Sequence, residues 1–159
     1  MRKLLLAITA LLTVQLSVAK LSVGDDVYLP ELVSMETGEA VDLSQYKGKV
    51  LFVEFWASWC VTCAKSFPVY NELHKDLDSD KFMMISINTD KKEKDAEKFL
   101  KDTPANFLVV RDTQKTAVKT YEPKGYPVGY IVDKSGKIVA IEESLAEYDE
   151  LKAIFEGLM

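Results

Sequence analysis

A Cys-x-x-Cys pair at the junction of a strand pattern and a helix pattern restricts the fold of this chain more than any other feature. The pair is Cys60 and Cys63, and the sequence contains no other cysteine. An apolar run at residues 50–56 precedes the pair, and a helical pattern follows it to about Asp76. The first thiol would then lie at a helix N-terminus, where free backbone N–H groups and the helix dipole stabilise a thiolate.

Such surroundings lower a cysteine pKa from ~8.5 to between about 3.5 and 7.5, which makes a nucleophile at neutral pH. We therefore predict that Cys60 attacks disulfides. Cys63 lies one helical turn further on and is placed to attack the mixed disulfide at Cys60 and release the partner.

The first nineteen residues have the pattern of a secretory signal. Arg2-Lys3 precedes an apolar segment at residues 4–14, and residues 17–19 (Ser-Val-Ala) form a small-x-small cleavage site. We expect cleavage after residue 19 and one mature domain at residues 20–159. The alternative is an uncleaved anchor, although the apolar run is shorter than the ~20 residues that span a bilayer. Export to the periplasm or to the outer face of the cytoplasmic membrane allows disulfides to persist.

Composition excludes several classes of function. The 159 residues, 48% hydrophobic and 28% charged, are typical of one soluble globular domain. Acidic side chains outnumber basic ones, 25 to 20, and loss of the leader makes the domain more acidic, which argues against nucleic-acid binding.

A purely structural disulfide across two residues would stabilise little. Two thiols, with the single histidine, His74, far along the predicted helix, fall short of a zinc site. We expect no metal and no cofactor beyond the redox-active Cys60–Cys63 pair.

Hydrophobic patterning predicts an α/β domain in which strands and helices alternate. A small N-terminal hairpin with its turn at residues 36–39 precedes the central strand. Pro68 is expected to kink the helix after the cysteines. Thr89 or Asp90 is expected to cap the next helix, with Glu93 at the capping-box position for Asp90. The predicted strands are residues 49–56, 82–88, 107–110, 128–132 and 137–141; the predicted helices are residues 61–76, 90 to ahead of Pro104, 113–121 and 146–158.

These motifs together resemble the thioredoxin superfamily. The resemblance rests on residues 55–63 (Phe-Trp-Ala-Ser-Trp-Cys-Val-Thr-Cys), on Pro68, and on Gly125-Tyr126-Pro127 ahead of a strand and hairpin. The leader, the segment 41–49 and the extra helix and strand between residues 90 and 110 are similar to the exported TlpA/ResA branch. The implied fold is thioredoxin-like, a central mixed β-sheet flanked by helices, with an N-terminal β-hairpin and a helix-strand insertion.

The resemblance also implies roles for individual residues. Cys60 matches the attacking cysteine and Cys63 the resolving one. Pro127 matches a cis-proline beside the dithiol, and the preceding Tyr126 would pair with an extended substrate. Trp59 can line the same substrate surface.

Glu54, six positions before Cys60, stands where thioredoxins carry a buried acid. Burial raises a carboxyl pKa, so Glu54 would stay protonated near neutrality and pass protons to and from Cys63. The alternative is a glutamate at the sheet rim, solvated or paired with a lysine.

Two departures from the family pattern leave the direction of electron flow open. Thr62 stands where thioredoxins usually have proline, and Ser66 stands where ResA-like proteins often carry a glutamate. Our leading interpretation is an exported thiol-disulfide oxidoreductase that reduces disulfides in partner proteins. By resemblance, one substrate is the C-x-x-C-H haem-attachment site of apocytochrome c, and the electrons come from a membrane thiol donor.

Three alternatives accompany this interpretation. A dithiol oxidase would use the same two thiols in the opposite direction. A thiol peroxidase would lack the usual proline and threonine ahead of Cys60. A copper or haem chaperone would lack a third ligand.

Overall fold

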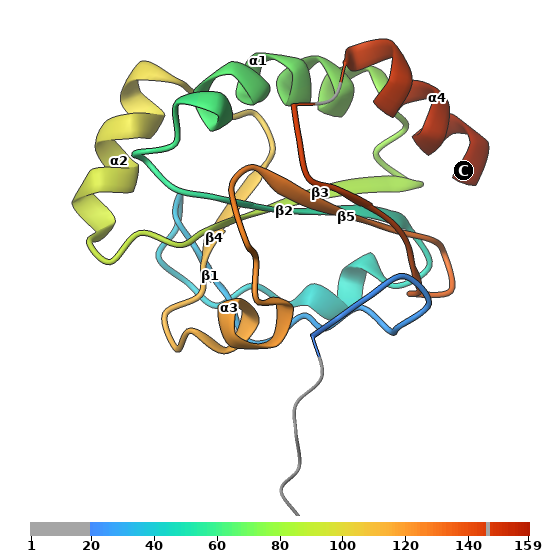
Figure 1. Cartoon of the computed structure of the whole chain (residues 1–159), viewed down its shortest axis with the longest axis horizontal. Helices are drawn as coiled ribbons and strands as arrows, with labels where there is room; N and C mark the ends of the chain where they lie inside the picture. The colour runs from blue at the N-terminus through green and yellow to red at the C-terminus, as the bar shows by residue number, and fades with distance from the viewer. Residues whose placement is uncertain (1–19, 146) are drawn as a thin grey trace, which may run out of the picture.

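The computed structural model describes residues 20–145 and 147–159, which form one mixed sheet flanked by helices (Figure 1). The predicted signal segment, residues 1–19, lies outside the described residues, as does Ala146, at which we expected the last helix to begin. In the described part of the chain the sheet has six strands in the order β1-β4-β3-β2-β5-β6. The strands are β1 Val33–Ser34, β2 Val50–Trp56, β3 Phe82–Asn88, β4 Leu108–Arg111, β5 Val128–Val132 and β6 Ile138–Glu142. The helices are α1 Val61–Asp76, α2 Glu93–Asp102, α3 Thr116–Tyr121 and α4 Tyr148–Leu158, with a 3-10 helix, η1, at Leu43–Tyr46.

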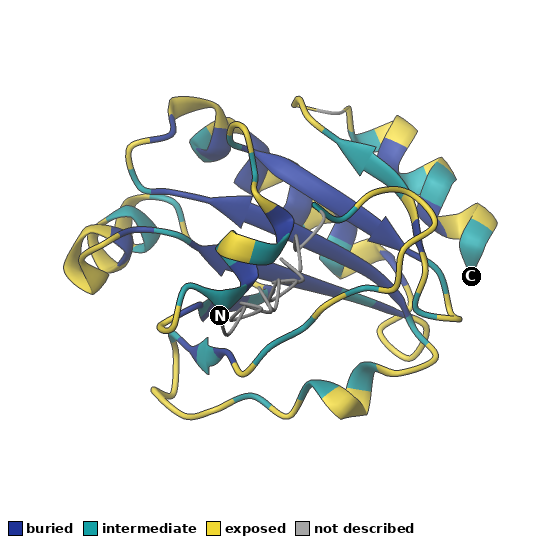
Figure 2. Ribbon diagram, turned by 60° about the horizontal axis from the view of Figure 1, so that its bottom comes forward, coloured by how far each residue is buried: buried dark blue, intermediate teal, exposed yellow. Residues whose placement is uncertain are grey.

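Strand β2 lies at the centre of the sheet, and every one of its residues is buried (Figure 2). It pairs in parallel with β3 and antiparallel with β5. Strand β4 continues the parallel part, whereas β1 and β6 add antiparallel edges. The near-continuous apolar run that predicted this strand therefore reflects helices and loops covering both faces.

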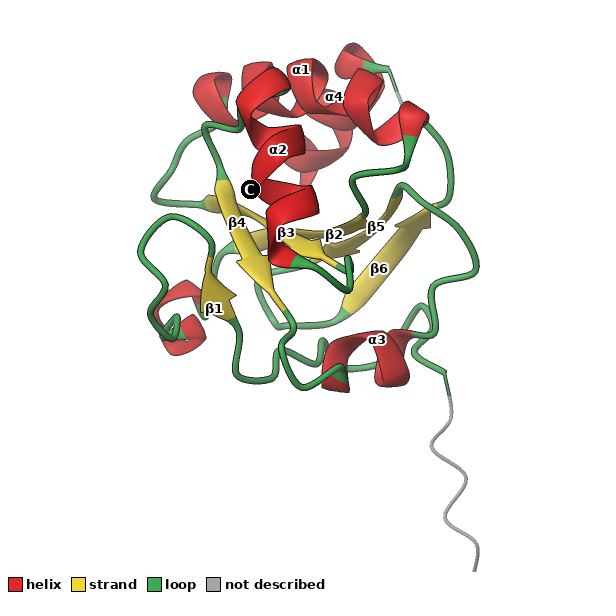
Figure 3. Cartoon of the chain, turned by 90° about the vertical axis from the view of Figure 1, so that its left-hand side faces the viewer, coloured by secondary structure: helices red, strands yellow, loops and turns green. Residues whose placement is uncertain are grey.

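The helices form two unequal layers. Helices α1, α2 and α4 cover one face, and α3 lies against the other with the N-terminal segment (Figures 1 and 3). Alternate residues of β2 divide between the two cores, with Phe52 and Trp56 beneath α1 and Phe55 facing α3. Rings fill both layers: Phe52 packs on Tyr70, and Phe55 packs on Tyr121.

The N-terminal hairpin is smaller than its sequence suggests. A single bridge joins Val33 to Ala40, while Val33 and Ser34 also pair with Arg111 and Val110 of β4. The segment therefore serves as the edge of the main sheet. It is too short for an independent hairpin, because two-stranded ribbons are marginal alone.

The predicted cap of α2 is wrong. The N-cap of α2 is Lys92, without a side-chain hydrogen bond, and Glu93 instead forms a 2.9 Å ion pair with Arg111. The Asp90 carboxylate accepts hydrogen bonds from Ser58 and Asn88. The contact with Ser58, in the turn after β2, is tertiary, and that with Asn88 is local. Together they occupy the carboxylate that was expected to cap α2.

Helix α1 continues through Pro68, and the kink stays a prediction. Among the described residues, no helix has the length and apolar content required to cross a membrane.

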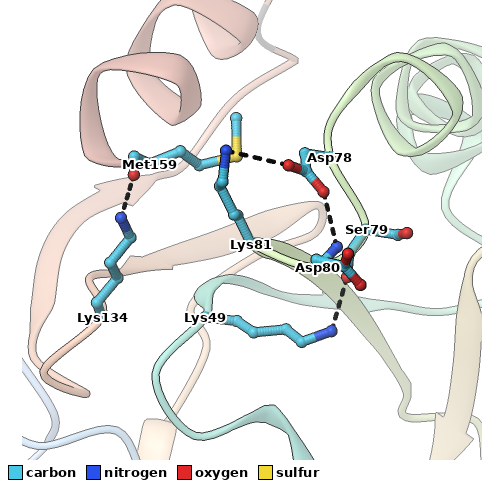
Figure 4. A network of polar contacts seen from close by, with 7 residues as sticks. All are labelled: Lys49, Asp78, Ser79, Asp80, Lys81, Lys134 and Met159. Carbon is cyan, nitrogen blue, oxygen red and sulfur yellow. Dashed lines mark hydrogen bonds and ion pairs between the residues drawn. The ribbon is translucent and has the colours of Figure 1, made fainter.

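Polar contacts hold the end of the sheet where β2 begins (Figure 4). The Lys49 ammonium donates to the carbonyl of Ser79 at 2.6 Å, and Lys81 pairs with Asp78 at 3.1 Å. Lys134 donates to the carbonyl of Met159, which ties the C-terminus to the β5–β6 loop. These contacts lie at the opposite end of β2 from the cysteines. One end of this strand therefore carries structural contacts and the other carries the dithiol.

Candidate active site

The two cysteines lie where β2 passes into α1 through a tight turn. The Cys60 amide donates to the Ala57 carbonyl at 3.0 Å, and Cys60 is the N-cap of α1. Its Sγ accepts from the backbone N–H of Cys63 at 3.0 Å, and the two residues form a disulfide. The strand, turn and helix order that the sequence predicted therefore exists, with one sulfur at the positive end of the helix.

Exposure distinguishes the two sulfurs. Cys60 is 6% exposed, whereas Cys63, in the first turn of α1, is fully buried. A partner disulfide can therefore approach Cys60 and not Cys63. The exposed Val61 and the 70% exposed Trp59 flank this opening.

Glu54 is a fully buried carboxyl in the middle of the sheet. Ser86 of β3 donates to its Oε2 at 2.7 Å, and Oε1 has no hydrogen-bond partner among the described residues. Burial raises the pKa of Glu54 to about 8, which the Ser86 hydrogen bond partly opposes. The alternative position at the sheet rim is wrong, because β3 and β5 flank Glu54 on both sides.

The Glu54 side chain lies on the same face of β2 as Phe52 and Trp56. That face packs against α1, which carries Cys63. Burial raises the pKa of the nearby Tyr70 above its ordinary value, and the Glu54 charge adds to that shift. The structure thus places a carboxyl with a raised pKa in the layer between β2 and α1, which carries Cys63.

Tyr126 and Pro127 are joined by a cis peptide bond, as the resemblance implied. The Tyr126 ring packs edge-on against Trp59, with ring centroids 5.5 Å apart. Two of the sequence-predicted substrate residues, Trp59 and Tyr126, therefore meet next to Cys60, although they come from segments far apart in the chain, and Pro127 is bonded to the second of them.

A groove of about 490 Å³ lies on the other side of Cys60. The turn and α1 form one wall, including Trp59 and Val61, and α2 forms the second wall. The ionisable residues that line this groove are Asp95, Lys98 and Asp102.

Sequence reasoning missed several residues around the dithiol. Ser86 and Asn88 are ordinary polar residues in the sequence. The partner of Ser86, Glu54, lies on the neighbouring β2, and the partner of Asn88, Asp90, follows the end of β3. His74 is half-buried, packs against Phe107, and has its pKa lowered by desolvation. Ser66 is buried, and its hydroxyl donates to the Thr62 carbonyl at 3.1 Å.

Among residues 20–145 and 147–159, no group of three or more His, Cys, Asp or Glu side chains is arranged to hold a metal ion.

Comparisons with known proteins agree with this geometry. A family model described as Redoxin matches residues 22–152. The thiol-disulfide oxidoreductase ResA of Bacillus subtilis (strain 168) is 30% identical over 123 residues, which cover 77% of this chain and 69% of ResA.

Solved structures show the same arrangement of elements. A protein of Chlorobium tepidum, provisionally assigned as the thiol:disulfide interchange protein DsbE, superposes with a TM-score of 0.75 at 33% identity, over 87% of this chain and 96% of that one. The exposed lipoprotein thioredoxin of Streptococcus pneumoniae (strain TIGR4) superposes with a TM-score of 0.71 at 29% identity, over 80% and 98% of the two chains.

Substitution of Glu54 by Gln tests the buried carboxyl through stability. Between the ordinary carboxyl pKa of 4.5 and the folded pKa of about 8, the native state binds more protons than the unfolded chain. The free energy of unfolding of the wild type therefore falls as pH rises through that window. Glu54→Gln removes this term, so the variant gains on the wild type as the pH rises from 4.5 to about 8, by on the order of a few kcal/mol. Urea unfolding of both oxidised proteins measures the difference; parallel pH curves would show that Glu54 does not change its pKa on folding.

Proposed function

The chain belongs to the Redoxin family and is a ResA-like thiol-disulfide oxidoreductase of the thioredoxin superfamily; from that premise we propose that it reduces protein disulfides outside the cytoplasm. The Cys60 thiolate attacks one sulfur of a partner disulfide, and the other partner sulfur leaves and takes up a proton. Cys63 then loses its proton and attacks Cys60 Sγ, which releases the second partner thiol. Two electrons pass to the partner, and Cys60 and Cys63 end as a disulfide.

The charge around the dithiol is the observation that supports this direction. A strong dithiol oxidant has a stabilised reduced form, which requires a favoured thiolate. Here Asp95 and Asp102 line the groove beside Cys60 with one cation, Lys98, and the two residues between the cysteines, Val61 and Thr62, carry no charge. The net negative charge of this surface disfavours the Cys60 thiolate and so destabilises the reduced form of the pair. This lowers the reduction potential.

The reduction potential of the Cys60–Cys63 pair tests the direction. We expect a value near or below about −250 mV in dithiothreitol buffers of graded ratio. A value near −120 mV, the range of DsbA, would make the protein a disulfide donor and would contradict the proposed direction.

We assign the proton transfer at Cys63 to Glu54. The Cys63 thiol must lose its proton before it attacks Cys60, and both groups are closed off from water. A carboxyl with a pKa of about 8 is close to an ordinary thiol pKa of ~8.5, so the proton passes between them at small cost. The ionised form of Glu54 accepts this proton, and its Oε1 has no hydrogen-bond partner among the described residues.

Glu54→Gln should slow the resolving step by about tenfold or more, because an amide cannot accept the proton. The reduced protein is mixed with an aromatic disulfide, and release of the second aromatic thiol reports the attack by Cys63 over a pH series. Cys63→Ser, which should release one thiol only, calibrates the signal. The exposed Glu97→Gln is the matched control. An unchanged rate and pH profile in Glu54→Gln would exclude the proton role.

For the substrate surface, we propose that an extended segment of the partner crosses Trp59, Tyr126 and Pro127. The exposed Trp59 ring offers an apolar platform, and the carboxylates Asp95 and Asp102 favour a cation on the groove side. A haem-attachment site, C-x-x-C-H, carries an ionisable imidazole next to its disulfide. Apocytochrome c is therefore our proposed substrate, an analogy with the TlpA/ResA branch that the charge of the groove supports.

Two oxidised peptides test this substrate. A C-x-x-C-H peptide should be reduced faster below about pH 6 than the same peptide with alanine for histidine, by about two- to fivefold, which corresponds to one surface charge pair of up to about 1 kcal/mol. Asp95→Asn with Asp102→Asn should abolish the preference. Equal rates for the two peptides in the wild type would contradict the proposed recognition.

Export and the electron donor complete the proposal. Basic residues, an apolar segment and a small-x-small site support cleavage after residue 19, and the N-terminal sequence of the exported protein should then begin at Lys20. A reductant outside the cytosol needs its thiols restored by a membrane thiol donor. Cys63→Ser should accumulate mixed disulfides at Cys60 with substrate, and their identification by mass spectrometry would reveal the partner.

A further inference from the structure

The turn that carries Cys60 is fastened to the end of β3 by side chains outside the dithiol. At the ends of the paired strands, the Thr89 amide and hydroxyl both donate to the Trp56 carbonyl at 2.9 Å. Two residues after Trp56 and one after Thr89, the Ser58 amide donates to Asp90 Oδ2 at 2.9 Å and the Ser58 hydroxyl to Asp90 Oδ1 at 3.1 Å. Both donor groups of Ser58 are therefore held by one carboxylate.

The Asp90 side chain is itself held rigidly. It is 5% exposed, and Asn88 Nδ2 donates to Oδ2 at 2.8 Å, while the Asp90 amide donates back to Asn88 Oδ1 at 3.1 Å. Lys115 Nζ approaches the backbone carbonyls of Thr89 and Asp90 at 3.2 and 3.4 Å. A buried carboxylate with three donors is expensive to disturb, because its loss leaves those donors unpaired.

The attachment of Ser58 to Asp90 contributes more to the position of Cys60 in the reduced protein than in the oxidised one. In the oxidised protein the disulfide holds Cys60 against the start of α1, whether or not Ser58 is fastened. In the reduced protein that covalent link is gone. The backbone hydrogen bonds of Cys60 to Ala57 and Ala64 and the Asp90 attachment then remain to keep Cys60 Sγ at the N–H of Cys63.

We propose that Asp90 is a positioning residue for Cys60, holding the Ser58 turn so that the free thiolate stays at the N-terminus of α1. The role concerns the dithiol couple itself and holds for either direction of electron flow.

A simple charge effect predicts the opposite outcome, which makes the proposal testable. If Asp90 acted only through its negative charge, Asp90→Asn would favour the thiolate and shift the couple toward the reduced form. If Asp90 acts by position, Asp90→Asn weakens the Ser58 attachment, because the bonds to the carboxylate lose their charge assistance and the amide has one acceptor oxygen instead of two. In the reduced protein the Cys60 thiolate then loses its hydrogen bond from the Cys63 N–H, whereas in the oxidised protein the disulfide still holds Cys60 in place.

The experiment uses the mature chain with Asp90→Asn, Ser58→Ala and the double variant. Ser58→Ala removes the hydrogen bond of the hydroxyl without changing the charge. It is the milder variant, and it tests the same attachment if Asp90→Asn fails to fold. Glu97→Gln, an exposed acid on α2, is the control for loss of one negative charge. Equilibrium with dithiothreitol gives the exchange constant, and iodoacetamide alkylation of the reduced protein over a pH series gives the Cys60 thiol titration.

We expect Asp90→Asn to shift the exchange equilibrium about tenfold toward the disulfide, which equals about 30 mV, because a hydrogen bond to a charged group is lost. Ser58→Ala should shift it the same way by about threefold. The double variant should not exceed Asp90→Asn, since both changes break the same attachment. The thiol titration of Cys60 should move to higher pH in each, and Glu97→Gln should leave both measurements unchanged.

Two results would overturn the proposal. A shift of Asp90→Asn toward the reduced form would show that charge decides. An unchanged exchange constant, with equal loss of unfolding free energy in the oxidised and reduced proteins, would show that the attachment is structural in both states.

Discussion

The parallel pairing of β2 with β3 is the constraint on which the site depends. The register runs from Val50 opposite Phe82 to Trp56 opposite Asn88, so the two strands end together. The pairing therefore brings two loops to one place, the cysteine turn after β2 and the segment with Thr89 and Asp90 after β3. The loop geometry at Cys60 is thus set by sheet pairing, which is far stiffer than a surface turn of a few residues.

The same pairing determines the environment of Glu54. A carboxyl in the middle of a central strand has no route to water, and the side chain opposite it on β3 is Ser86, a neutral donor. A cation at that position would have held the carboxylate charged. With one hydroxyl instead, desolvation prevails and the pKa rises to about 8. A buried acid of this kind lowers stability at alkaline pH, and sites under such strain are frequently functional.

The fold also separates the tasks of the molecule along β2. At one end, Lys49, Lys81 and Lys134 fasten loops and the C-terminus to the sheet (Figure 4). At the other end, the exposed Trp59 and the groove along α2 leave Cys60 open to a partner. The reactive cysteine therefore lies at one end of β2, while the contacts at the other end are structural.

Local pattern was sufficient for the elements that carry the cysteines. The run of apolar residues placed β2 almost at its true start, and α1, β3 and β5 have the predicted bounds, because helix and central-strand periodicities are properties of neighbouring residues. The motif also predicted the thioredoxin-like fold, the burial of Glu54 and the cis bond before Pro127.

Tertiary structure decided four other features: Ser86 as the partner of Glu54, the attachment of Asp90 to Ser58, the half-burial of His74 and the use of β1 as a sheet edge. Each depends on contacts between segments about thirty or more residues apart, and a single sequence holds no local signal for which donor a buried carboxylate will meet. For Asp90 the local signal was misleading, since a capping pattern was present and the donors at the ends of β2 and β3 outcompeted it.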